Sequence, residues 1–186
     1  MTAPVFLDSQ PTKSWEDPTP PNFSARAVHV AAVVLAGLSA GFFFAYEASV
    51  IRGLAQVDDL TYVRTFQAIN ATIRNPMFGI VFLGSFPALL AVNVLHRRFA
   101  WSVKRALLGI APVLYFVGMV ITFTGNVVLN NELADVDATS AAAAAEGREA
   151  FEDDWNQLDG YRTVAFLGAF VAAASALPLA DRGTRK

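Results

Sequence analysis

Hydrophobic residues gather in four long stretches that together make up much of the chain. The stretches cover residues 28–51, 77–95, 106–129 and 161–180. An α-helix rises about 1.5 Å per residue, so about 20 residues cross the roughly 30 Å hydrocarbon core of a bilayer. Each stretch is close to that length. The pattern predicts four transmembrane helices, because helices satisfy their own backbone hydrogen bonds in lipid.

The composition agrees with one membrane domain. The chain has 186 residues, of which 54% are hydrophobic and only 16% are charged, and its mean hydropathy is +0.41. We expect the four-span domain to cover residues 24–181. Residues 1–23 contain five prolines and are predicted to be a disordered tail, and residues 182–186 form a basic C-terminal tail. We expect no signal peptide, because the first apolar stretch begins late and is too long.

The link between the first and second stretches predicts a helix of its own. Asp58 is a good N-cap, and the residues from Leu60 to Arg74 repeat apolar positions at helical spacing. Asn75-Pro76 should end this helix and start the next, because the residue before proline avoids the α conformation.

The link between the third and fourth stretches, residues 130–160, is acidic. It carries nine Asp and Glu residues against Arg148 alone, which we interpret as a solvated face, with a cation-attracting rim as the alternative. Thr139 or Ser140 should cap a helix that reaches Trp155 and either breaks at Gly160 or continues. The predicted fold is therefore all-α, a four-helix transmembrane bundle whose helical extracytoplasmic loops cap one end.

Positive charge predicts the orientation of this bundle. The side that holds both termini and the link between the second and third stretches carries nine Lys and Arg residues, and the other side carries five. Because cytoplasmic loops carry an excess of these residues, we expect both termini in the cytoplasm and the protein in the cell membrane.

Charge and cysteine content exclude several kinds of function. The net charge is −2, so no basic surface indicates nucleic acid, and the absence of cysteine excludes disulfides, thiolate catalysis and Cys-ligated metals. His29 and His96 both fall at the cytoplasmic level, where a two-histidine metal or haem site is possible but interfacial histidines are the simpler interpretation. We predict no cofactor and no metal.

Polar side chains on the predicted loop helix stand on its apolar face. Gln67, Asn70 and Arg74 lie within about 60° of one another there, among Val63 and Phe66. Buried amides need hydrogen-bond partners, or each costs about 1–3 kcal/mol. Either this cluster faces the mouth of the bundle, or it ties the loop to the ends of the spans.

Further polar residues stand near the same end of the spans. Thr122, Asn126 and Asn130 form one stripe on the third span, either as contacts between helices or as a surface that faces a ligand. Glu47 lies about one turn inside the first span, where a carboxylate should be paired with an arginine, protonated or functional. Arg162 opens the fourth span at this level.

Four ordered motifs resemble the anthrone oxygenase family of small four-span membrane proteins, a pattern that also defines a domain of unknown function. The motifs are Gly41-x-Phe43…Tyr46…Gly53-Leu54, Gln67-Ala68-Ile69-Asn70…Asn75-Pro76-x-Phe78, Asn126-x-x-x-Asn130-x-x-Leu133 and Phe151-Glu152-x-x-Trp155…Arg162-Thr163. The resemblance covers residues 37–180. The chain departs from the family pattern at Glu47, usually a small hydroxyl residue, at Arg52 and Val128, usually proline, and at Asp159, usually Asn.

This resemblance implies oxidation of anthrones, which are tricyclic phenols, to anthraquinones by O₂, with no firmly associated cofactor. For this reaction we expect Glu47 of this chain to act as the catalytic base, and Asn126, Asn130 and Arg162 to act as donors to the developing oxyanion. The residues expected to bind the lipophilic aromatic substrate are Tyr46, Gln67, Asn70, Arg74, Asn75, Phe78 and Trp155.

Two other functions stay open. The chain could be a non-catalytic membrane protein that binds a lipid or a quinone-like molecule, or that stabilises a partner complex. A transporter subunit ranks third, because the polar residues crowd one end rather than the middle of the spans. The expected partners are membrane lipids, a lipophilic small molecule, and a second copy or another membrane protein, but not nucleic acid.

Overall fold

The computed structural model describes residues 23–97 and 101–179. These residues contain helices and no strand, which confirms the all-α prediction. The helices are α1 (Phe23–Ala45), η1 (Tyr46–Val50), α2 (Ile51–Leu54), α3 (Asp59–Thr72), α4 (Pro76–His96), α5 (Val103–Ile121), η2 (Thr122–Asn126), α6 (Val127–Ala134) and α7 (Ala141–Ala176). The predicted tails at residues 1–23 and 182–186 lie outside this description, except for Phe23, the first residue of α1.

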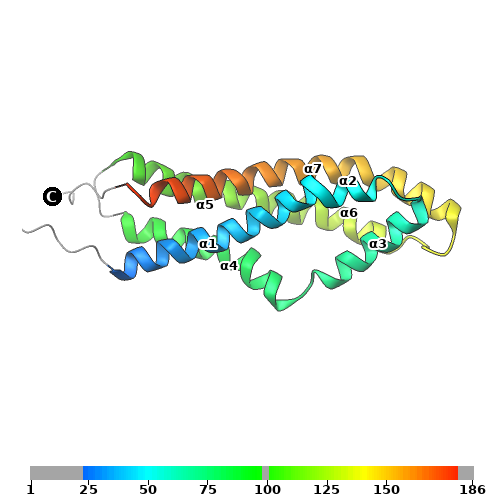
Figure 1. Cartoon of the computed structure of the whole chain (residues 1–186), viewed down its shortest axis with the longest axis horizontal. Coiled ribbons are helices and arrows are strands. Elements are labelled where there is room, and N and C mark those ends of the chain that lie inside the picture. Colours follow the sequence, from blue (N-terminus) through cyan, green and yellow to red (C-terminus); the bar gives the residue numbers. More distant parts are fainter. Residues whose placement is uncertain (1–22, 98–100, 180–186) are drawn as a thin grey trace, which may run out of the picture.

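Four long helices run side by side along the molecule (Figure 1). Helix α1 packs against α4 and α7, and α5 packs against the same two helices, so the four form a closed bundle. Helix α1 begins and α7 ends at the same end of the bundle. We call the opposite end, which carries α3 and the first turns of α7, the capped end.

Three of the predicted spans are long and apolar enough to cross a membrane. They are the continuous helical segments Ser24–Leu54, Pro76–His96 and Val103–Ala134. Large apolar side chains cover their outer surface, among them Ile80, which is 67% exposed, and Val113, which is 61% exposed. This surface fits an integral membrane protein, because lipid can cover it without the cost of exposing it to water.

The fourth predicted span is the C-terminal part of α7, which packs inside the same bundle. A stretch of 18 residues that ends at Ala176 begins with Asp159 and includes Arg162. These charges lower its mean hydropathy, so α7 is not among the three apolar helices. The fourth crossing stays a prediction.

The centre of the bundle is built from small and aromatic side chains. Ala32, Ala36, Ala169 and Ala173 are fully buried where α1 meets α7 and the other helices. Small residues let helix backbones approach closely in membranes. Toward the capped end the core becomes aromatic, and the ring of Phe166 lies 4.6 Å from that of Phe43 and 4.8 Å from that of Tyr115.

The helix starts that the sequence predicts in the cap are confirmed. Asp58 accepts a hydrogen bond from the Thr61 backbone N–H at 3.0 Å and begins α3. Asn75 accepts one from the Phe78 backbone N–H at 3.0 Å and begins α4. Ser140 caps α7, which then continues through Gly160 without a break.

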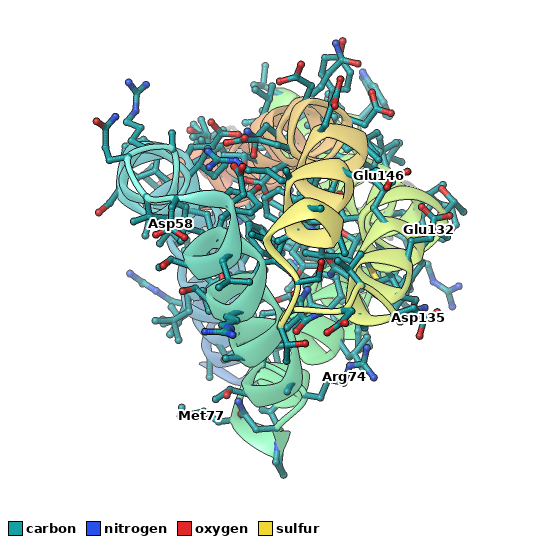
Figure 2. The ribbon with its side chains drawn as sticks, turned by 90° about the vertical axis from the view of Figure 1, so that its right-hand side faces the viewer. Asp58, Arg74, Met77, Glu132, Asp135 and Glu146 are labelled. Atoms are coloured by element: carbon teal, nitrogen blue, oxygen red, sulfur yellow. The ribbon has the colours of Figure 1, made fainter. Side chains whose placement is uncertain are left out.

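Acidic side chains surround the capped end, as Figure 2 shows for Asp58, Glu132, Asp135 and Glu146. These four are exposed to solvent, which agrees with the predicted solvated face. Asp159 is an exception, because its side chain is completely buried. Its place in a solvated face was predicted wrongly.

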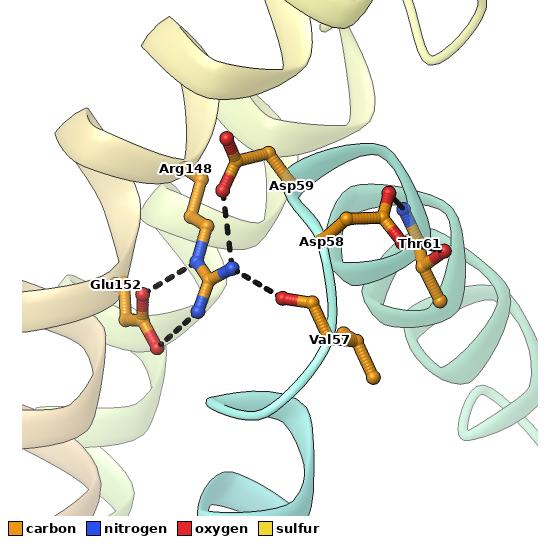
Figure 3. Close-up of polar contacts among 6 residues, drawn as sticks. All are labelled: Val57, Asp58, Asp59, Thr61, Arg148 and Glu152. Atoms are coloured by element: carbon orange, nitrogen blue, oxygen red, sulfur yellow. Dashed lines mark hydrogen bonds and ion pairs between the residues drawn. The ribbon is translucent and has the colours of Figure 1, made fainter.

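Arg148 joins the cap to α7 (Figure 3). Its guanidinium donates to the Glu152 carboxylate at 2.6 Å, to the Asp59 carboxylate at 3.1 Å and to the Val57 carbonyl at 2.9 Å. It also lies 4.4 Å from the centre of the Tyr62 ring. Burial, reinforced by Glu152 and opposed by Arg148, raises the pKa of the Tyr62 phenol, which therefore stays neutral under ordinary conditions.

We predict that Gly118→Ala destabilises the bundle. An added Cβ atom would lie 2.6 Å from a ring carbon of Phe166, and such overpacking costs about 1–3 kcal/mol. Gly41→Ala on α1 is the control, because no atom lies within 4 Å of the added carbon. Thermal unfolding in detergent checks both variants, and equal melting temperatures would contradict the packing.

We predict that Arg148→Ala loosens α3 without unfolding the bundle. The change removes four hydrogen bonds that one cation, only 15% exposed, donates to three residues, so local stability should fall by about 1–3 kcal/mol. Amide hydrogen exchange should quicken in residues 57–72 and not in α5. Glu149→Ala, an exposed neighbour, should leave exchange at both places unchanged.

Candidate functional site

Two π-helical turns interrupt the first and third spans near the capped end. They are η1, which carries Tyr46 and Glu47, and η2, which ends at Asn126. Both turns pack against α7. A π turn inserts one residue into the helical repeat and redirects the side chains around it, and such turns are frequent at functional sites. The site described here lies between these turns and α7.

A buried ion pair forms the centre of the site. Arg162 donates from Nε and Nη2 to one carboxylate oxygen of Asp159, at 2.7 Å and 2.5 Å. Arg162 is 6% exposed and Asp159 is not exposed at all. The guanidinium carbon also lies 4.6 Å from the centre of the Phe43 ring and 5.0 Å from that of Trp155. The charges are thus paired and surrounded by aromatic rings, as burial demands.

Asp159 is the site residue that the sequence prediction missed. It stands three residues before Arg162 on one helix, a spacing that allows an ion pair. It also lies where the acidic link meets the fourth apolar stretch. That position and spacing were the available signals.

Glu47 does not pair with an arginine side chain in the described part of the chain. Arg52 donates to the backbone carbonyl of Glu47 at 3.2 Å and not to its carboxylate. The Glu47 carboxyl group instead lies against α7, where its Oε1 is 3.4 Å from the position that a Cβ atom on Gly160, the residue after Asp159, would take. Glu47 and Asp159 both lie within electrostatic range of Arg162. Two acids and one cation therefore meet at this point.

The asparagines of the third span hold α7 in place. Asn126 is fully buried and donates to the Trp155 carbonyl at 3.1 Å. Asn130 accepts from the Trp155 indole N–H at 2.7 Å. Thr122, the third member of the predicted stripe, donates to the Gly118 carbonyl of its own helix at 2.8 Å. Two of the three thus bridge helices, as the interpretation of helix contacts predicts.

Aromatic side chains line the same region in two layers. Tyr46 lies 6.1 Å from Trp155 and 5.0 Å from Phe42, measured between ring centres. Phe78 is one layer further away, 5.2 Å from Phe42 and 5.3 Å from Phe82. Tyr46 and Trp155 therefore belong to the centre, and Phe78 to its apolar surround.

The polar residues of α3 and of the turn that follows it lie in the cap and not at the ion pair. Gln67 donates to the carbonyls of Leu133 and Val136, at 2.9 Å and 3.0 Å. Arg74 donates to the Asn131 side chain at 3.2 Å. These bonds fit the interpretation that the loop helix is tied to the span ends. Asn75 caps α4, and the buried Asn70 side-chain nitrogen has no hydrogen-bond partner among the described residues.

Several buried polar atoms near the ion pair lack hydrogen-bond partners within the described residues. They are Glu47 Oε1, Asp159 Oδ2, Asn126 Oδ1 and Thr163 Oγ1. An unsatisfied buried polar group costs about 1–3 kcal/mol. Their concentration on η1, η2 and the adjoining part of α7 indicates a region suited to a polar ligand atom or an exchangeable proton.

Two depressions near the capped end lie beside this centre and not in it. One, of about 290 Å³, runs between η2 with α6 and α7 and includes Thr124, Asp154 and Gln157. The other, of about 150 Å³, lies where α6 meets the start of α7 and includes Gly147 and Phe151. Neither is lined by any predicted site residue.

The two histidines lie together at the opposite end of the bundle. Their ring centres are 5.9 Å apart, and both side chains are buried inside the bundle. His29 Nε2 is 2.9 Å from the Ala173 carbonyl, and His96 Nδ1 is 2.9 Å from the Val92 carbonyl. No group of three metal-binding side chains occurs in the described residues.

Comparison with known proteins gives the relationship. A family model described as anthrone oxygenase matches residues 62–172, which is more than half of the chain. The chain belongs to the anthrone oxygenase family. The match includes Asn126, Asn130, Trp155 and Arg162 of this anthrone oxygenase family member, but it begins after Glu47. No curated protein and no solved structure matches the chain significantly.

We predict that Asp159→Leu destabilises the protein by about 3–5 kcal/mol, because it removes the buried carboxylate that accepts both hydrogen bonds of Arg162. Arg162→Met should cost a similar amount. The double variant should recover much of the loss, since both charges are removed together. Unfolding in mixed detergent measures this coupling, and strictly additive losses would contradict it.

Proposed function

We propose that this protein is an integral membrane oxygenase that oxidises a lipophilic hydroxy-aromatic substrate of the anthrone type. Family membership supports the reaction class. The observation that carries the proposal is the buried group of Glu47, Asp159 and Arg162, held among aromatic rings at one end of an apolar bundle.

The chemistry requires few parts. Removal of a proton from the activated CH₂ group of an anthrone gives an electron-rich anion that can reduce O₂ directly. One O₂ then converts the CH₂ group to a carbonyl group and releases one water. The protein has to supply a base, hydrogen-bond donors for the oxyanion and an apolar site for the rings.

We assign these parts to the residues around the ion pair. Glu47 is the proposed base, because one of its carboxyl oxygens is buried and lacks a donor. Arg162 is the proposed principal donor to the oxyanion, and its place between two aromatic rings suits a flat ligand. Asn126 and Asn130 would complete the donor set after a rearrangement of their bonds to Trp155.

The remaining predicted residues receive supporting roles. Tyr46, Trp155 and Phe78 would contact the substrate rings or their apolar surround. Gln67, Asn70, Arg74 and Asn75 would hold the cap over the site, as the bonds of Gln67 and Arg74 to the neighbouring segment suggest.

We further propose that the protein lies in the cell membrane with both termini in the cytoplasm, following its distribution of Lys and Arg. The capped end with its acidic surface would then face outward. The proposed reaction uses no cofactor. Lipids are its proposed surroundings, and a second copy or a membrane-protein partner is possible on the apolar outer surface.

A non-catalytic binding role is the second candidate. It is favoured by the two depressions, which do not reach the ion pair, and by the asparagines, which already bond to Trp155. In that case the protein would bind a lipid or quinone-like molecule, or stabilise a partner complex, without changing the ligand.

We predict that purified protein accelerates O₂ consumption with 1,8-dihydroxyanthrone, after subtraction of the rate without protein. Glu47→Gln should lower kcat by about 100-fold or more, because a general base contributes about 10²–10⁴-fold. Glu149→Gln, an exposed acid of the cap, should retain the wild-type rate.

Asn126→Leu/Asn130→Leu extends this experiment to binding. We expect this variant to lose both activity and any aromatic molecule that co-purifies with the wild type. A wild-type protein that retains such a molecule but consumes no O₂ would support the second candidate. Full activity in Glu47→Gln would overturn the proposed base.

A further inference from the structure

We propose that Glu47 and Asp159 share a single proton and act together as one base, whose negative charge passes to an acidic hydroxy-aromatic ligand when the ligand is bound. The identity of the ligand rests on the proposed function, whereas the shared proton rests on the geometry alone. The inference goes further than a lone Glu47 base, because it makes Asp159 part of the proton acceptor.

The first support is the position of the two acids. Glu47 Oε1 lies 3.4 Å from the position that a Cβ atom on Gly160 would take, directly after Asp159 on α7, so the two carboxyl groups are neighbours. Glu47 Oε1 and Asp159 Oδ2 are both buried, and neither has a donor in the described part of the chain. Two carboxylate oxygens in contact repel each other when both are ionised. One proton between them would supply the missing hydrogen bond to both oxygens at once.

The second support is the charge balance. Arg162 contributes one positive charge, and its carboxylate contacts are with Asp159. With two ionised acids the buried group would carry a net negative charge, and with two protonated acids Arg162 would be left unbalanced. With one shared proton the group is neutral overall, which is the state that burial favours.

Few other groups around the pair can change this balance. Tyr46 on η1 interacts electrostatically with Arg162 and Asp159, and it is neutral as a phenol. Arg52 on α2 donates to the backbone of Glu47 and not to its carboxyl group. The polar group that η2 contributes is Asn126, which does not titrate.

The proton transfer follows from this arrangement. A bound phenol or enol would give its O–H proton to the pair, so that both acids become protonated and the ligand becomes an oxyanion. The O–H bond breaks, a new O–H bond forms on a carboxylate, and the total charge stays the same. Arg162 loses its carboxylate partner and gains the oxyanion in its place. The pair therefore selects ligands with a weakly acidic hydroxyl group on an aromatic or enolisable ring.

Infrared spectroscopy of the pure protein tests the shared proton without any substrate. At neutral pH the wild type should show the C=O stretch of one protonated carboxyl group, which shifts in D₂O. Glu47→Gln and Asp159→Asn should each abolish this band, because the remaining acid then pairs with Arg162 alone. Glu149→Gln should retain it. Both amide variants preserve shape and one acceptor, and size-exclusion chromatography and thermal unfolding check that they are folded.

A titration of the wild type keeps the test valid if a variant does not fold. The band that is present at neutral pH should disappear in alkali. In acid a second buried carboxyl group should add to it, at a frequency separate from the band of the exposed acids, which the unfolded chain provides. Absence of the band at neutral pH, or its survival in both folded variants, overturns the shared proton.

A dye titration tests the transfer to a ligand. The probe is 1,2-dihydroxyanthraquinone, whose neutral and ionised forms differ in colour and which has no CH₂ group to oxidise. The dye bound to wild type should absorb as the anion at a pH where the free dye is neutral. Dye bound to Glu47→Gln or Asp159→Asn should absorb as the neutral form. If the infrared band is present but the bound dye keeps the colour of its neutral form, the shared proton is supported. The transfer of charge to this ligand class is then overturned, and with it the proposed substrate.

Discussion

The buried ion pair between Asp159 and Arg162 is the constraint on which the rest of the capped end depends. Two charges inside an apolar bundle are tolerated only when they are paired and when their remaining surroundings compensate for lost water. The surrounding groups meet this requirement: aromatic rings lie against the guanidinium, a second acid lies beside the carboxylate, and two amides from the third span bond to Trp155 of α7. The fold thus concentrates its electrostatic cost in one place.

Helix α7 links this centre to the cap. It runs from the solvent-exposed acidic surface into the bundle without a break, so its first turns and its charged centre belong to one rigid element. Arg148 attaches the start of α3 to this helix, and Gln67 attaches the middle of α3 to the link after α6. Beside these bonds, Val63 and Phe66 of α3 belong to a buried apolar cluster with Phe151 and Trp155 of α7, so the cap is held both by polar attachments and by a core of its own.

The elements of the fold could be predicted because their signals are local. Apolar length marks the spans, and Asp58, Asn75 and Ser140 mark helix starts through bonds to residues three positions ahead. The sequence alone could not decide whether α7 continues through Gly160, because this continuity depends on support from neighbouring helices. The convergence of Glu47, Asn126 and Arg162 was predictable from their common level in the spans.

The partners of these residues were harder to predict. The local sequence before Asp159 resembles that around the exposed acids of the same link. Only the packing of η1 and η2 against α7 removes Asp159 from water. For the same reason the contact between Glu47 and Asp159 was not foreseen. The two acids come from the first predicted span and from just before the fourth, and the fold makes them neighbours.

The two π turns have a consequence for the history of the sequence. A π turn is an α-helix with one extra residue, which the turn itself accommodates, so losing a residue within Tyr46–Val50 or Thr122–Asn126 would restore regular helix while the flanking helix stays almost in place. Such a deletion would leave the length of the spans almost unchanged, but it would redirect the side chains of the turn itself, among them Glu47 on the first span or Asn126 on the third. Relatives that keep this centre should therefore align without gaps through both turns.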